Sequence, residues 1–254
     1  MTLLDDVVVH AEPVMGTVVS FHLYPGSGGD FEARAALRAA CERLHRLDEI
    51  FTTWSPASAM SRFRGGRLRP HEVPAELPVV LELCRQARAV SGGWFDPWAM
   101  PGGLDPTGLV KGWAVEQALG LLGGAGLEGA MVNAGGDVAL LGHPPGGAGW
   151  RIGIRHPWRA DALACVIEAE GAVATSGCYE RGAHLVDPRN GRPSQAAASA
   201  TVIGPRLAFA DALATALAVG GDEALELIGG LAGYEAYLIR ADGTELATAG
   251  VVFS

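Results

Sequence analysis

Hydrophobic residues recur with two different periods in the first part of the chain. Residues 7–9 and 16–23 are short runs rich in valine, and the second alternates in polarity as a half-buried β-strand does. Across residues 31–51 the apolar positions instead recur every three or four residues, with arginine and glutamate on the other side. The pattern predicts two strands followed by an amphipathic helix, and Asp30 is expected to cap that helix.

The same two periods divide the rest of the chain. Residues 52–63 are polar and are expected to form a loop. Helical spacing recurs in four further segments, and Gly112 is a weak point in the second of them. These predicted helices cover residues 76–90, 110–122, 208–221 and 223–231. Apolar strands separated by glycine turns are predicted in the remainder, at residues 129–142, 150–157, 165–177 and 234–250.

These elements favour an α+β fold. The 36 glycines and 15 prolines imply many tight turns, which a helical bundle does not need. No internal repeat, low-complexity tract or linker interrupts the pattern, so residues 1–254 are expected to form one domain.

Charge excludes one class of partner. The net charge is −9 and the 19 basic residues are scattered, so the chain lacks the clustered lysine and arginine that nucleic acid requires. An anionic small ligand remains compatible, because main-chain N–H groups and a metal ion can hold phosphate within an acidic protein.

The cysteines and the N-terminus indicate a reduced, soluble protein. Cys41, Cys84, Cys165 and Cys178 are far apart and form no metal-binding or disulfide spacing. The first residues do not resemble a signal peptide, and no apolar run reaches the roughly 18 residues that span a bilayer. We therefore expect a cytoplasmic protein without membrane insertion.

Three polar motifs stand out, and each is open to two interpretations. Residues 133–137, "NAGGD", form either a ligand-facing glycine turn or a hairpin closed by its own Asn and Asp; they lack the spacing of a dinucleotide-binding Rossmann unit. His184, beside an apolar Leu-Val pair, is either structural or catalytic. Asp211 and Thr215 share one helix face, either as ordinary helix residues or as oxygen ligands of the kind that Mg²⁺ prefers.

Taken in order, the motifs resemble those of the ApbE family of flavin transferases. The resemblance runs through nearly the whole chain. Its segments are "MGT" at Met15, "FTTWSPASAMSRF" at Phe51, "GWFDP" at Gly93, "LDPTGLVKGWAVE" at Leu104, "NAGGD" at Asn133, "TSG" at Thr175, "HLVDPRNGRP" at His184 and "ADALATAL" at Ala210.

The resemblance implies an α+β fold of two closely packed lobes with FAD in a cleft between them. It also implies Mg²⁺-dependent transfer of FMN from FAD to a Thr or Ser hydroxyl of an acceptor flavoprotein, with release of AMP. His184 is the implied base. Asp187 either orients it or shapes the turn, and we expect that it shapes the turn. The implied flavin contacts are Met15, Trp54, Trp94, Phe95, Asp96, Asp105, Lys111 and Leu185, and the implied metal site comprises the Gly108 carbonyl, Asp211, Ala214 and Thr215.

Three positions depart from the family pattern. Trp54 replaces a common tyrosine, Cys178 a usual acidic residue and Asn190 a usual threonine, so flavin affinity and the acceptor-facing rim are expected to differ. Two other functions use the same residues: hydrolysis of FAD to FMN and AMP, and flavin binding without turnover.

Overall fold

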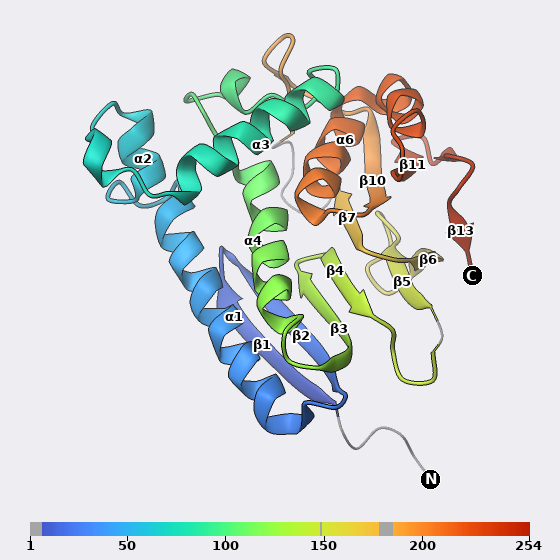
Figure 1. Cartoon of the computed structure of the whole chain (residues 1–254). Coiled ribbons are helices and arrows are strands. Elements are labelled where there is room, and N and C mark those ends of the chain that lie inside the picture. Colours follow the sequence, from blue (N-terminus) through green and yellow to red (C-terminus); the bar gives the residue numbers. More distant parts are fainter. Residues whose placement is uncertain (1–6, 148, 178–184) are drawn as a thin grey trace.

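The computed structural model describes residues 7–147, 149–177 and 185–254 (Figure 1). Its centre is an eight-stranded sheet in the order β1-β2-β3-β4-β7-β10-β11-β12, and every neighbouring pair is antiparallel. The strands are β1 (Val8–Val14), β2 (Thr17–Pro25), β3 (Leu127–Ala134), β4 (Asp137–Gly142), β7 (Ala172–Ser176), β10 (Ala197–Gly204), β11 (Glu235–Arg240) and β12 (Glu245–Ala247).

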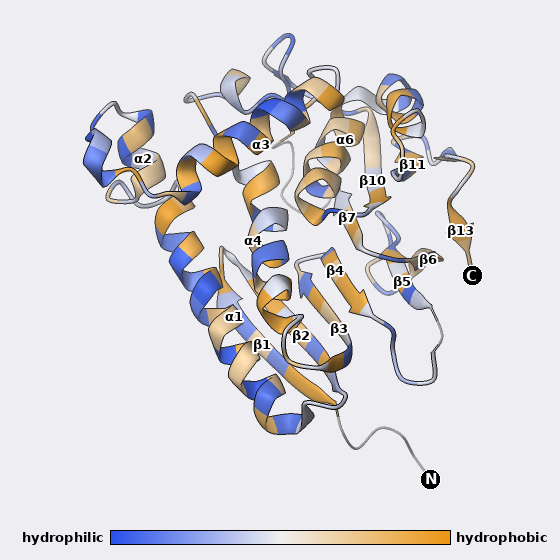
Figure 2. Cartoon of the chain, in the orientation of Figure 1, coloured by the Kyte–Doolittle hydropathy of each residue, from blue (hydrophilic) through white to orange (hydrophobic). Residues whose placement is uncertain are grey.

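Helices cover one face of this sheet. In Figure 1, α1 (Gly29–Phe51), α4 (Thr107–Leu122) and α6 (Leu207–Gly229) lie in front of it. The main core forms between these layers, and Ala130, Val132 and Ala134 of β3 point into it. Figure 2 shows hydrophilic turns along α1, whereas α6 is mostly apolar, because α1 keeps an exposed side and α6 is buried almost all round.

A second, smaller sheet covers part of the opposite face. It contains β5 (Trp150–Arg155), β6 (Leu163–Ala169) and β13 (Val252–Phe253), in the order β13-β6-β5. Val138 and Leu140 of β4 pack against it, while Ala139 between them faces the helices. The central strands are thus buried on both faces, which is why their sequences are almost continuously apolar.

Short elements complete the chain and surround one end of the large sheet. They are α2 (Ala59–Arg64), η1 (Pro70–Glu72), α3 (Glu76–Val90), η2 (Pro97–Ala99), β8 (Val186–Asp187) and β9 (Arg192–Pro193). No helix of the described residues is long and apolar enough to cross a bilayer.

The predicted α+β class and most predicted elements are confirmed, with three local corrections. Asp30 does not cap α1 but lies in its first turn, paired with Arg34. The expected loop at residues 52–63 contains α2, because Ser58 Oγ accepts the Ser61 N–H at 3.0 Å and caps a helix there. Helix α4 begins at Thr107, before the predicted start. The last two predicted helices are both present within α6, which is kinked between them at the non-helical Gly221.

Candidate functional site

Two tight turns and the end of one strand mark a single end of the large sheet. Strands β1 and β2 meet at Met15-Gly16, and β3 and β4 meet at Gly135-Gly136. Because Val19 of β2 pairs with Ala134 of β3, both turns lie at the same end. The last residue of β7, Ser176, lies there too, since β7 runs antiparallel to β4.

A cleft of about 930 Å³ opens at this end of the sheet. Its volume lies near the top of the ~300–1,000 Å³ range of small-molecule sites. The walls come from both turns, the end of α1, the loop before α4, and α6. Of the residues predicted as functional, the cleft is lined by Met15, Trp54, Trp94, Phe95, Asp96, Asp105, Gly108, Lys111, Leu185, Asp211 and Thr215.

The first turns of α4 and α6 meet at the floor of the cleft. The Asp211 side chain is 4% exposed, and its Oδ2 accepts the Gly112 N–H at 3.0 Å. A Cβ at Gly112 would lie 2.5 Å from the Leu207 carbonyl oxygen. The absence of a side chain at Gly112, the expected weak point, is therefore what allows the two helices to approach so closely.

Hard oxygen donors gather beside this contact. A Cβ at Gly108 would lie 3.5 Å from Thr215 Oγ1, so the α4 backbone passes next to that hydroxyl. Ser176 Oγ lies 3.4 Å from Thr215 Oγ1. Segments that are remote in the sequence thus place a main-chain turn, a carboxylate and two hydroxyls together, a donor set suited to Mg²⁺.

Lys111 and Asp137 form an ion pair at the same floor. Asp137 is 1% exposed and its Oδ1 also accepts the Thr175 N–H at 3.2 Å. The "NAGGD" turn combines both interpretations, because Asn133 Oδ1 accepts the Gly136 N–H at 2.8 Å while the turn lines the cleft.

The three aromatic residues that were predicted to contact the flavin differ in how freely a ligand can reach them. Trp54 is 94% exposed, whereas Phe95 is 5% exposed and packs against Gly108. Trp94 packs against Gly220 on one side, and the Arg189 guanidinium carbon lies 3.3 Å from the centre of its ring. A ligand ring can therefore stack on Trp54 without displacing protein atoms, but on the Arg189 side of Trp94 only if Arg189 moves.

Met15 is held in an unfavourable backbone conformation. Its φ of 56° is the only positive value among the described non-glycine residues. Asp48 Oδ2 accepts the Met15 N–H at 3.0 Å and fixes the turn against α1. Such strain costs about 1–3 kcal/mol and gathers at functional sites.

Two carboxylates that were predicted to contact the flavin already accept hydrogen bonds from other groups of the protein. Asp96 accepts Arg88 Nε at 2.6 Å and the Trp98 N–H at 3.0 Å. Asp105 Oδ1 accepts the Thr107 N–H at 3.0 Å and so caps the start of α4. Both carboxylates shape the loop that carries the cleft wall.

Ala214 is fully buried and does not line the cleft. His184 and Cys178 lie outside the described residues. Asp187 shapes its turn as expected, because its carboxylate accepts the Arg189 N–H at 2.8 Å and Asn190 Nδ2 at 2.7 Å.

Two charged residues of the cleft lining were not predicted. Asp48 looks like any polar residue of an amphipathic helix, and only its bond to Met15 distinguishes it. Arg155 ends the alternating strand β5 on its exposed side and brings a positive charge to the cleft. Neither belongs to a recognisable motif.

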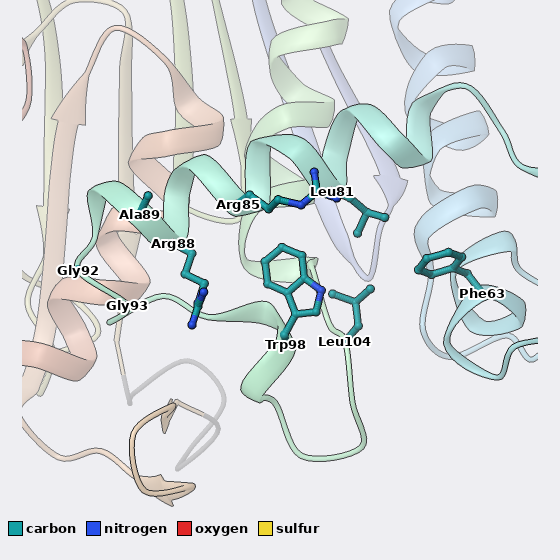
Figure 3. A pocket seen from close by; sticks show the side chains of 9 residues that line it. All are labelled: Phe63, Leu81, Arg85, Arg88, Ala89, Gly92, Gly93, Trp98 and Leu104. Carbon is teal, nitrogen blue, oxygen red and sulfur yellow. The ribbon is translucent and has the colours of Figure 1, made fainter.

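A second cavity of about 720 Å³ lies between α3 and the loop at residues 93–104 (Figure 3). Trp98 stands in it beside Leu104, facing Arg85 and Leu81 of α3. Its two arginines are already paired, Arg85 with Glu82 and Arg88 with Asp96. This cavity is mostly apolar and holds none of the oxygen donors of the cleft.

Several proteins with assigned names are similar in sequence to this chain. A protein named FAD:protein FMN transferase from Rhodobacter capsulatus is 38% identical over 155 residues, 57% of this chain and 29% of that protein. One of the same name from Chlamydia pneumoniae is 25% identical in a match that covers 78% of this chain and 81% of its own. The first three curated relatives are matched over only 29%, 39% and 47% of their length.

Solved structures share the fold. The flavin transferase ApbE from Vibrio cholerae superposes with a TM-score of 0.82 at 22% identity, over 96% of this chain and 97% of that one. The flavinyl transferase ApbE of Pseudomonas stutzeri gives 0.81 at 24% identity, over 98% and 97%. The sequence profile described as "ApbE family" matches residues 15–103 and 99–238. Because that match extends over well more than half of the sequence, the chain belongs to the ApbE family.

Proposed function

We propose that this chain, acting as one domain over residues 1–254, transfers FMN from FAD to a threonine or serine hydroxyl of an acceptor protein. Its family membership and the names of its relatives support this function. The observation that carries the proposal is the convergence, in one cleft, of the α4 backbone, Asp211, Thr215 and Lys111 beside aromatic side chains. These are the groups needed to hold a flavin and to neutralise a pyrophosphate.

The apolar lining is suited to the flavin rings. Met15, Trp54, Trp94, Phe95 and Leu185 would contact them, and each aromatic stacking pair contributes about 1 kcal/mol. Asp96 and Asp105 would act through the loop whose hydrogen bonds they complete. Lys111 would face the phosphates, because its ammonium group lies at the cleft floor.

The donors at the floor fit Mg²⁺. The Gly108 carbonyl and the side chains of Asp211 and Thr215 would hold the ion, with Ala214 packed behind them. When bound, the ion would neutralise charge on the bridging phosphates as AMP leaves.

Proton removal and stabilisation of the leaving group would be carried out by residues of the chain. His184 would take the proton of the acceptor hydroxyl, since a neutral hydroxyl is a weak nucleophile. The hydroxyl oxygen then bonds to the FMN phosphorus while the bond between that phosphorus and the AMP oxygen breaks. Lys111 would stabilise the negative charge of the departing phosphate, and Asp137 would keep the ammonium group in place.

The test combines the purified chain with FAD, Mg²⁺ and a flavin-acceptor domain. The expected product is a fluorescent acceptor band that survives denaturing electrophoresis, with one AMP released per flavin transferred. Asp211→Asn and His184→Ala should each lower the rate by at least about 100-fold. His71→Ala, at an exposed position outside the cleft, is the matched control.

Each part of the proposal has its own contrary result. If His184→Ala labels as fast as the unaltered chain, His184 is not the base. AMP release that does not depend on an acceptor identifies an FAD pyrophosphatase. Bound FAD with no AMP release under any divalent ion identifies a flavin-binding protein.

A further inference from the structure

A group of metal-binding side chains lies between β1 and α1, apart from the cleft. Alternate residues of β1 face α1, and Val8 and Val14 are buried there. The two positions between them carry His10 and Glu12, where an apolar residue would be expected.

Helix α1 contributes two further metal-binding side chains to the same place. Cys41 and His45 are one turn apart, which puts them on one face of the helix. Glu12 Oε2 lies 2.8 Å from His10 Nε2, and Glu12 Oε1 lies 2.8 Å from His45 Nε2. The ligand atoms of His10, Glu12 and Cys41 all lie within 4.8 Å of one another.

We propose that these four residues, the β1–α1 cluster, bind a divalent transition-metal ion of the Zn²⁺ type. Two imidazoles, a carboxylate and a thiolate are a donor set that Zn²⁺ takes, in contrast to the oxygen donors of the cleft floor. Zn²⁺ bonds of about 2.0–2.3 Å put tetrahedral donors about 3.3–3.8 Å apart, so the ligand atoms of His10, Glu12 and Cys41 would draw closer together around the ion. His45, which contacts Glu12, would turn toward the ion as the fourth ligand.

The charges of the cluster favour a cation. Glu12 is a carboxylate, and the Cys41 thiol must lose its proton to ligate a metal. A divalent ion supplies the positive charge that a carboxylate and a thiolate require together.

The position of the cluster gives the ion a structural role. None of the four residues lines the cleft, but Asp48, close behind His45 on α1, holds the strained Met15 turn that does. An ion joining β1 to α1 would stabilise the junction on which this turn is built.

The experiment uses the full chain, stripped with a chelator and titrated with CoCl₂. Four-coordinate cobalt bound to sulfur gives strong visible absorption and a thiolate-to-cobalt charge-transfer band in the near ultraviolet, and ZnCl₂ should displace both. Cys41→Ser should lose the charge-transfer band. His45→Ala changes an exposed side chain and should weaken Co²⁺ binding at least about 10-fold without unfolding the chain.

Two controls separate this site from other thiols and from the cleft. Cys165→Ser, which alters a half-buried thiol on β6, should keep the band. Asp211→Asn should also keep it, so failure of the proposed transferase function would not affect the result. Absence of the band in the unaltered chain, or its survival in Cys41→Ser, would overturn the proposal.

Discussion

At the scale of single residues, the ion pair of Lys111 and Asp137 shows most clearly what the sequence conceals. Each residue stands out in its own segment, one as a lone lysine at a helix start and the other at the edge of a glycine turn. Their contact depends on how α4 packs against the sheet, because neither segment contains a signal that points to the other.

Removing the acidic partner tests this pair. Asp137→Asn should lower the free energy of unfolding by about 1–3 kcal/mol, since it leaves the half-buried ammonium group of Lys111 without its counter-charge. In a Lys111→Met background the same change should cost clearly less. Chemical denaturation of the unaltered chain, the two single variants and the double variant gives the coupling energy, and additive effects would show that the pair does not contribute to stability.

At the scale of elements, the contact between α4 and α6 positions the cleft floor. The helices were predictable from the spacing of their apolar residues, although the start of α4 was not, because Asp105 caps it from outside the periodic segment. Their close approach depends on Gly112, whose place in a helix looks unfavourable on helix propensity alone.

Two glycines of α4 offer a matched comparison. Gly112→Ala should destabilise the fold by about 1–3 kcal/mol, because the new methyl group would meet the α6 backbone. Gly120→Ala has no atom within 4 Å of the new Cβ and should stabilise by about 0.5–1 kcal/mol. Thermal unfolding gives the change in Tm for each variant, and equal changes in the two variants would contradict close packing at Gly112.

The junction of α1 and α3 should depend on pH. The hydrogen bond from Arg43 NH1, at 2.8 Å, lowers the pKa of Glu76 below its usual 4.5. A lowered folded-state pKa means that the stabilisation is present above about pH 4.5 and is lost as the pH falls through the folded-state value. Glu76→Gln should lower the free energy of unfolding by up to about 1 kcal/mol at pH 7 and by progressively less toward pH 3. Chemical denaturation at several pH values measures this difference. A difference that stays constant from pH 7 to pH 3 would show that the Arg43–Glu76 pair is not its source.

At the scale of the whole molecule, the cleft is built by both turns of the sheet and by three helices, so a ligand bound there should stabilise the entire fold. FAD with Mg²⁺ at about 100 times its Kd should add about 2.7 kcal/mol. For a chain of this size that corresponds to a rise in Tm of about 5–10 °C.

Trp54→Ala is the informative variant for this measurement. Because Trp54 is 94% exposed, Tm without ligand should not change. Loss of one stacking surface should weaken FAD binding about 5-fold and reduce the rise in Tm that FAD and Mg²⁺ cause. An unchanged rise in Tm would exclude Trp54 from the flavin site.

The sequence alone determined most of the helices and strands, the α+β class and the segments that line the cleft. Those features follow from local periodicity, turn residues and ordered motifs, which are all properties of neighbouring positions. Tertiary structure alone decided which groups meet: Lys111 with Asp137, Gly112 with Asp211, and His10 and Glu12 with Cys41 and His45. These contacts join residues far apart in the chain, and their distances are fixed by the packing of helices on the sheet.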